Sequence, residues 1–219
     1  MIISKLRRAC NIKDECVNLN HKVVTEIQLK PYFLHKTKKG IKIHTNMGYL
    51  LSLEAISKAA KELKRSNSIV YTHGAYDLFH YGHLEFLRLS KEKGQILIVG
   101  IDSDELLPVY KNVKRPVINL EERLNIISKL QYVDFVFPLK YIPNIDSNVS
   151  KDKPSLYHLN IYKLLKPDII TYGKAYSGVK TIKRAKKTFK NIKFKKIIHK
   201  YSNIQSTTKV IDKILSSQN

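Results

Sequence analysis

Two histidines, His80 and His83, stand three positions apart around a tyrosine and a glycine. At a junction between a loop and a helix, this spacing lets both imidazoles face the same side. An imidazole can donate a hydrogen bond or carry a positive charge near neutral pH. Gly82 allows a phosphate to approach the backbone closely, and the N–H groups at the start of a helix attract anions. The pattern therefore indicates phosphate chemistry.

Nucleotidyl transfer is a phosphate reaction that these side chains can support with little covalent help. The attacking phosphate is already a nucleophile, so catalysis depends on positioning and on stabilising charge at the α-phosphoryl oxygens and the departing pyrophosphate. Two alternatives stay open for His80 and His83. They could be surface histidines near a helix start, or half of a zinc site completed from elsewhere, for example by Cys10 and Cys16. We assign no metal ligand from the sequence.

The elements around these histidines alternate in type. Short β-branched and aromatic runs predict strands, and helical spacing of apolar residues predicts helices between them. We expect strands over 68–72, 96–99, 135–137, 169–172 and 194–199, and helices over 53–65, 84–93, 121–130, 157–165, 181–189 and 206–215. This alternation predicts an α/β fold with a Rossmann-like, doubly wound parallel sheet. Ligands bind at the carboxyl ends of such strands, where the loop from Thr72 to His83 begins.

The first fifty residues differ from the rest of the chain. They are mixed and polar, with a short strand expected over 41–44 and no pattern that carries chemistry. We therefore divide the chain into a small N-terminal extension of unknown role, residues 1–50, and a domain expected to carry the phosphate chemistry, residues 51–219.

Composition limits the class of protein. The 219 residues, 43% of them hydrophobic, can bury one sizeable core. No apolar run approaches the ~20 residues of a membrane helix, no secretory signal follows Met1, and two cysteines favour a reducing cytoplasm. The net charge of +22 fits nucleic acid, an anionic membrane or phosphate-rich substrates, or simply lysines solvated over the whole surface. The basic run from Lys180 to Lys196 lacks a nucleic-acid module, so neither nucleic acid nor membrane is firmly indicated.

The segment from Gly74 to His83 has the pattern G-x-[FY]-D-x-x-H-x-G-H. It resembles the signature of the cytidylyltransferase-like nucleotidyltransferases of the HIGH type. That family includes glycerol-3-phosphate, phosphocholine and phosphoethanolamine cytidylyltransferases and the adenylyltransferase domain of ADP-heptose synthase. Further matching pieces follow in the family's order between about Leu51 and Leu215: Leu97 to Gly100, Ser103-Asp104, Lys111, Arg115-Pro116, Leu120 to Arg123, Val133-Asp134, Lys166 to Asp168, Gly173 to Tyr176 and Ser206 to Thr208.

The resemblance implies roles for individual residues. Catalytic contacts to the phosphates fall to His80, His83, Lys111 and Arg123. Nucleotide binding falls to Thr72, His73, Gly74, Ala75, Tyr76, Gly82, Ser206, Thr207 and Thr208, and acceptor binding to Asp77 and Tyr176. Structural alternatives stay open for several of these: a salt bridge for Arg123, helix capping for Ser206 to Thr208, loop capping for Asp77 and core packing for Tyr176. The resemblance also implies a homodimer and Mg²⁺ carried mainly by the nucleoside triphosphate.

Three functions remain open. The Gly74 to His80 string and the Leu120 to Arg123 segment narrowly favour transfer of CMP from CTP to a small phosphate monoester, namely a polyol, amino-alcohol or sugar phosphate. The helix before the first strand and the Leu165 to Asp168 segment favour an adenylyltransferase that uses ATP and a sugar phosphate. The closing segment of the domain, residues 201–208, has Tyr201 and Ile204 where the family has arginine and glycine. That departure, with the high charge, keeps open a protein that binds nucleotide or nucleic acid without catalysis.

Overall fold

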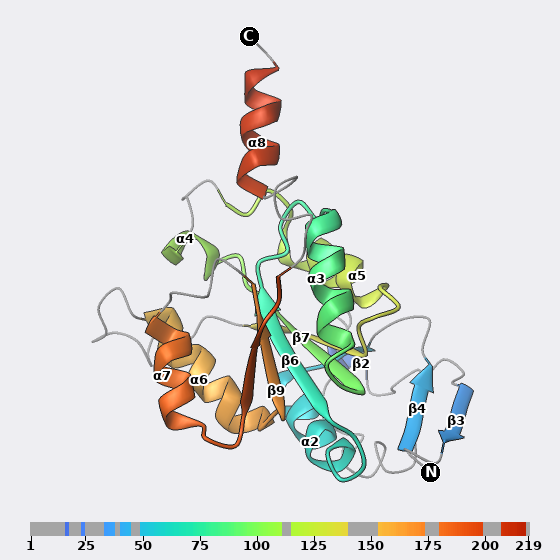
Figure 1. Ribbon diagram of the computed structural model, residues 1–219. Coiled ribbons are helices and arrows are strands. Elements are labelled where there is room, and N and C mark those ends of the chain that lie inside the picture. The colour runs from blue at the N-terminus through green and yellow to red at the C-terminus, as the bar shows by residue number, and fades with distance from the viewer. Residues whose placement is uncertain are drawn as a thin grey trace.

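The computed structural model describes residues 16–17, 23–24, 33–37, 40–44, 49–110, 115–139, 153–173, 180–198 and 207–217. Its centre is a six-stranded sheet flanked by helices (Figure 1). The strand order is β10-β9-β6-β7-β8-β5, and every pair is parallel. The strands are β5 (Tyr49–Leu50), β6 (Ile69–Gly74), β7 (Ile96–Asp102), β8 (Phe135–Leu139), β9 (Ile169–Tyr172) and β10 (Lys193–Lys196).

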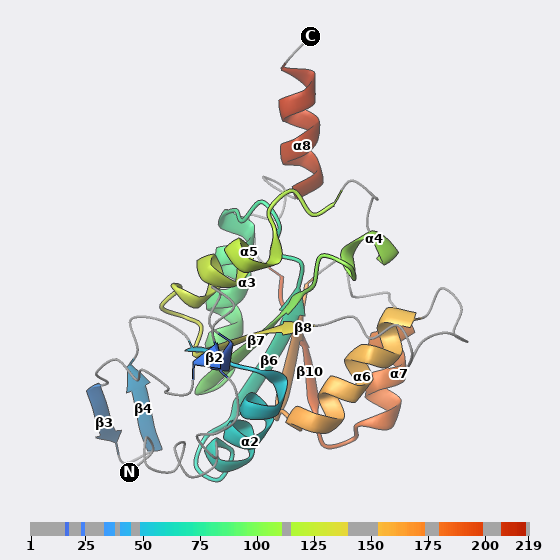
Figure 2. The ribbon, with the colours of Figure 1, turned by 180° about the vertical axis from the view of Figure 1, so that it is seen from behind.

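The alternation of side chains along the strands explains why helices cover both faces. Ile69 and Tyr71 of β6 join one buried cluster, whereas Val70 between them joins a second cluster on the other face. The first cluster includes residues of α2 (Leu53–Leu63), α6 (Lys153–Leu165) and α7 (Lys180–Thr188); the second includes residues of α3 (Tyr81–Lys91) and α5 (Leu120–Ser128). Successive residues of a strand point to opposite faces, so strands that are apolar throughout need two helical layers. Figures 1 and 2 show these layers from opposite sides. The predicted Rossmann-like, doubly wound fold is confirmed.

The strand order creates one reversal near the middle of the sheet. From β6 the chain proceeds through β7 and β8 on one side, and then returns to place β9 on the other side of β6. Ligands bind at such a switch point, outside the carboxyl ends of the strands. The loop that carries His80 and His83 leaves the sheet at this end of β6.

Helix boundaries follow from their caps. Ser52 caps α2 by accepting a hydrogen bond from Ala55 N, and Asn119 caps α5 by accepting one from Glu122 N. A side-chain oxygen at this position satisfies an N–H that the helix leaves without an internal partner. All the expected strands and helices occur, with ends shifted by a few residues. A short helix, α4 (Leu107–Tyr110), was not expected. The last helix, α8 (Thr207–Ser216), projects away from the sheet in both views.

The described parts of the N-terminal extension form short strand pairs. β1 (Cys16–Val17) pairs with β2 (Val23–Val24), and β3 (Phe33–Thr37) pairs with β4 (Gly40–His44). β4 confirms the strand expected over 41–44. β5 belongs to the main sheet although it precedes residue 51, so this sheet draws on the last residues assigned to the extension.

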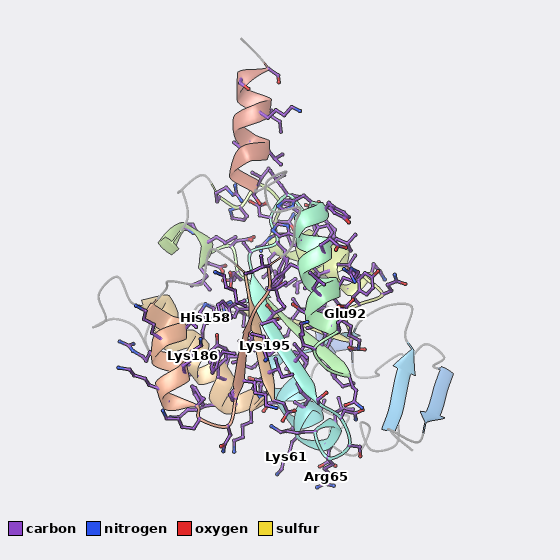
Figure 3. All side chains as sticks on the ribbon, in the orientation of Figure 1. Lys61, Arg65, Glu92, His158, Lys186 and Lys195 are labelled. Carbon is purple, nitrogen blue, oxygen red and sulfur yellow. The ribbon has the colours of Figure 1, made fainter. Side chains whose placement is uncertain are left out.

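The basic run forms α7 and the edge strand β10. Its lysines are mostly exposed, including Lys186 and Lys195 (Figure 3). Charged side chains on an edge strand oppose pairing with another sheet, which accounts for lysines there without a ligand. Within the described residues, no helix combines the length and the hydropathy needed to cross a membrane.

Candidate functional site

His80 and His83 lie together at the start of α3. His80 is the N-cap residue, with extended backbone angles, and its carbonyl accepts hydrogen bonds from the N–H groups of His83 and Leu84. The two imidazole rings stack with centroids 3.9 Å apart and planes 20° apart. Both side chains are partly exposed, whereas Gly82 between them is buried. The expected pairing of the rings at a helix N-terminus is therefore present, and an anion near them would also meet the positive end of the helix dipole.

The loop before these histidines has an unusual backbone. Tyr76 and Leu78 have φ angles of 51° and 46°, in the left-handed region that non-glycine residues seldom adopt. Tyr76 is nevertheless buried, and its ring meets His83 edge-on at 5.4 Å. The ring of Phe79 also packs near His83, with the two ring centroids 5.7 Å apart. Aromatic packing thus fixes the orientation of His83, and strained backbone of this kind is typical of functional loops.

Asp77 holds this loop against the segment before α5. Its carboxylate accepts hydrogen bonds from the N–H groups of Val117 and Ile118 and forms a 2.6 Å ion pair with Arg115 Nε. The Asp77 side chain is fully buried. This environment differs from the acceptor-binding role expected for Asp77 and matches the alternative of loop capping, because its oxygens already have protein partners.

Arg123 also differs from its expected role. It is fully buried and donates from Nε to the carbonyl of Ile118 and from Nη1 to the carbonyls of Ala75 and Asp102. Its Nη2 pairs with the carboxylate of Asp104. The guanidinium is directed at protein oxygens from three segments, so we assign it to positioning the loop and not to phosphate contact. The salt bridge considered from the sequence exists, although its partner is Asp104 and not a glutamate.

The closing segment reaches the same loop. Thr207, the first residue of α8, donates a hydrogen bond from Oγ1 to the carbonyl of Asp77 at 2.9 Å. Thr208 follows in the first turn of that helix. The predicted roles of Lys111, Tyr176 and Ser206 fall outside the described residues. The structure thus brings one member of the closing segment to the histidine loop, across 130 positions of sequence.

The residues at the start of the loop form hydrogen bonds with other parts of the protein. Thr72 is buried and donates from Oγ1 to the carbonyl of Thr171 on the neighbouring strand. Ala75 supplies the carbonyl that Arg123 binds, and Gly74 is the last residue of β6. Contacts between a nucleotide and these residues stay a prediction. They would be made by backbone atoms, since this segment lies at the carboxyl end of β6.

His73 belongs to a second group of polar side chains. Its ring stacks on His158 of α6 with centroids 3.7 Å apart, and its Nε2 lies 3.3 Å from the hydroxyl of Tyr162. Burial lowers the pKa of His73 to about 4. Burial, followed by the charge of His73, also lowers the pKa of His158 well below its usual value. Asp102, at the end of β7, completes the group.

Sequence reasoning did not identify Asp102 or His158 as members of the site region, and it gave Asp104 no role beyond its place in the matching Ser103-Asp104 pair. A carboxylate directly after the apolar run of β7 was a usable signal, because the carboxyl ends of parallel strands meet at one edge. His158 had no comparable signal. A histidine within a helical pattern is usually a core or surface residue. Its neighbours are known only once the packing of the helix against the sheet is known.

Comparisons with known proteins agree with this geometry. The profile of the cytidylyltransferase-like family matches residues 71–213. Bifunctional protein HldE from Sulfurimonas denitrificans is 31% identical over 160 residues, 73% of this chain and 29% of the relative. The HldE protein of Campylobacter fetus is 30% identical over 165 residues, 75% of this chain and 31% of the relative. The matched segment is therefore about a third of the length of these relatives.

A solved structure resembles the fold. Pantoate-beta-alanine ligase from Francisella tularensis, complexed with beta-gamma ATP and beta-alanine, superimposes with a TM-score of 0.51 at 17% sequence identity. The similarity covers 77% of this chain and 78% of the ligase. At this identity the likeness concerns the arrangement of the sheet and helices.

Proposed function

Because the chain belongs to the cytidylyltransferase-like family of nucleotidyltransferases, we propose that it transfers a nucleoside monophosphate from a nucleoside triphosphate to a small phosphate monoester. The observation that carries the proposal is the stacked pair His80 and His83 at the N-terminus of α3. This pair lies beside the carboxyl edge of a parallel sheet, where phosphates bind in folds of this type.

The reaction needs one displacement at phosphorus. An oxygen of the acceptor phosphate forms a bond to the α-phosphorus, the bond to the β-phosphate oxygen breaks, and pyrophosphate leaves with that electron pair. His80 and His83 donate hydrogen bonds to the phosphate oxygens on which negative charge develops. Donors that are already oriented lose little energy in reorganisation when that charge appears. The aromatic contacts of Tyr76 and Phe79 with His83 support such an orientation.

The ion pairs around the loop support the same mechanism indirectly. Asp77 with Arg115 and Arg123 with Asp104 fix the backbone between β6 and α3 from two sides. The hydrogen bond from Thr207 to Asp77 adds the start of α8 to this assembly. A loop held at several points keeps the two imidazoles in one geometry, which is how positioning lowers an activation barrier.

Mg²⁺ carried by the triphosphate fits these residues. The carboxylates of Asp77 and Asp104 already accept hydrogen bonds from backbone N–H groups and arginines. Phosphate oxygens would therefore supply most of the Mg²⁺ ligands. When bound, the ion neutralises phosphate charge during transfer.

Two nucleotide specificities have support. The relatives named HldE support transfer of AMP from ATP to a sugar phosphate, as in the ADP-heptose synthase type. The Gly74 to His80 string supports transfer of CMP from CTP, and this narrow preference stays a prediction. Homodimer formation also stays a prediction.

Pyrophosphate release tests the proposal. The purified full-length chain is incubated with Mg²⁺ and either ATP or CTP, together with glycerol 3-phosphate, phosphocholine, phosphoethanolamine, or hexose and heptose 1-phosphates. We expect release that requires both one nucleotide and one acceptor, with the corresponding diphosphate-linked product detected by mass spectrometry. A chain whose melting temperature rises with a nucleotide, but which releases no pyrophosphate with any acceptor, would be a binding protein instead.

A further inference from the structure

Three buried or partly buried side chains, none of them assigned a catalytic role, converge beside the loop that carries His80 and His83. We propose that His73, Asp102 and His158 form a binding site for a divalent transition-metal ion of the Zn²⁺ type. This inference is independent of the nucleotidyl transfer proposed above, and also of the Mg²⁺ carried by a nucleotide.

The fold brings these residues together from three elements. His73 is the penultimate residue of β6, Asp102 is the last residue of the neighbouring strand β7, and His158 lies in α6. Figure 3 shows His158 between its helix and the sheet. One candidate ligand atom from each residue lies within 4.8 Å of the other two. Bonds of about 2.0–2.2 Å to Zn²⁺ place its ligand atoms roughly 3–3.5 Å apart, so metal binding would draw the three side chains closer together.

The donor chemistry selects the class of ion. The side chains of Asp102 and His158 are 0% and 5% exposed, and His73 is partly buried. Burial lowers the pKa of both histidines and keeps the imidazoles neutral near pH 7, which is the form of imidazole that coordinates a metal. Burial raises the pKa of both Tyr76 and Tyr162, and the negative charge of Asp102 adds to each shift. Two imidazoles and a carboxylate suit Zn²⁺ and related ions, whereas Mg²⁺ and Ca²⁺ prefer oxygen ligands.

Tyr162 provides the supporting contact that a ligating histidine requires. Its hydroxyl lies 3.3 Å from Nε2 of His73. In the tautomer that donates Nε2–H to this hydroxyl, Nδ1 of His73 is the metal ligand. A hydrogen bond of this kind fixes the tautomer and the orientation of the ring. The rings of His73 and His158 now lie 23° from parallel, and metal binding would tilt them further toward a common point.

Three protein ligands define a site that can accept a further ligand. Zinc sites with three side chains complete their coordination with water or with a bound molecule. His73 is adjacent in sequence to Gly74, where the nucleotide loop begins. A phosphate oxygen is therefore a chemically suitable fourth ligand, although the proposal requires only the ion itself.

Metal titration of the chelator-treated, full-length protein tests the proposal. Zn²⁺ binding is measured by calorimetry, and Co²⁺ absorption serves as a spectroscopic probe of nitrogen and oxygen ligands. We expect one ion per chain, and loss of at least about tenfold in affinity in His158→Asn and Asp102→Asn, because even supporting contacts account for roughly 10–100-fold. Tyr162→Phe should weaken binding by less than either of these substitutions.

Two control variants separate this site from the other candidate ligands. His83→Asn disrupts the second stacked histidine pair, and a Cys10→Ser, Cys16→Ser double variant removes both thiols. Both should bind Zn²⁺ as the unchanged chain does. Circular dichroism checks the fold of each variant, and His158→Asn serves if Asp102→Asn does not fold. The proposal is overturned if the unchanged chain binds no ion, or if either control variant loses binding while His158→Asn keeps it.

Discussion

The hydroxyl of Thr207 donates a 2.9 Å hydrogen bond to the backbone carbonyl of Asp77, joining the start of α8 to the loop that carries His80 and His83. The Asp77 side chain is at the same time buried in its ion pair with Arg115. Asp77 therefore connects the loop to two other segments. Its backbone carbonyl contacts α8, and its carboxylate contacts the segment before α5.

Thr207→Val should reduce turnover because the start of α8 loses its tie to this loop. The change keeps the shape of the side chain and removes one hydrogen bond, worth about 0.5–1.5 kcal/mol of unfolding free energy. Pyrophosphate release and chemical denaturation provide the two measurements. Thr207→Ser should retain the bond. Thr188→Val removes a hydroxyl that bonds only within its own exposed helix end in the described structure, and it should leave turnover unchanged.

Arg123→Met should destabilise the fold by about 1–3 kcal/mol, because the carbonyls of Ala75, Asp102 and Ile118 lose the guanidinium that donates to them. The Asp104 side chain is 40% exposed and is solvated by water, so the loss of its ion pair adds less than about 1 kcal/mol. Urea denaturation measures the loss. Arg65→Met is the matched control: Arg65 is 65% exposed and pairs with Glu62 on the surface, so its replacement should cost less than about 1 kcal/mol. Normal stability of Arg123→Met with a raised KM for nucleotide would instead support phosphate contact.

His80→Ala and His83→Ala should each lower kcat by roughly 10²–10³-fold, the usual effect of removing one donor to a developing negative charge. Their melting temperatures should stay close to that of the unchanged chain, because both side chains are partly exposed. Tyr81→Phe, between them and 50% exposed, is the control and should keep its activity. Normal turnover in both histidine variants would contradict the assignment of His80 and His83 to the catalytic site.

The metal-free protein should lose stability as the pH falls from about 6.5 toward 4. The pKa of His73 is lowered to about 4 in the folded state, so over this range the unfolded chain binds more protons than the folded chain, and protonation favours unfolding. For a partly buried ring the loss is about 1–3 kcal/mol. Urea denaturation at several pH values with chelator present measures it. His73→Asn should flatten this dependence, and an unchanged slope would contradict the assignment.

The sequence by itself determined the order of the elements and the place of the histidine pair. A continuous apolar run such as Ile69 to Tyr71 must bury both faces of its strand, so helices on both sides of the sheet follow from the local pattern. The spacing of His80 and His83 likewise determines that their rings share one side of a helix start, because residues three apart are neighbours on a helix. These features depend on interactions between residues close in sequence.

Only the tertiary structure decided what the charged and polar side chains contact. Arg123 and Asp77 matched a functional pattern, yet the side chains of both are buried against partners up to 48 positions away. His158 lies beside His73 and Asp102 because α6 packs against β6 and β7. The physical reason is that a charged group has no regular spacing to its partner: its environment depends on which distant segments exclude water around it, and that is settled when the layers pack.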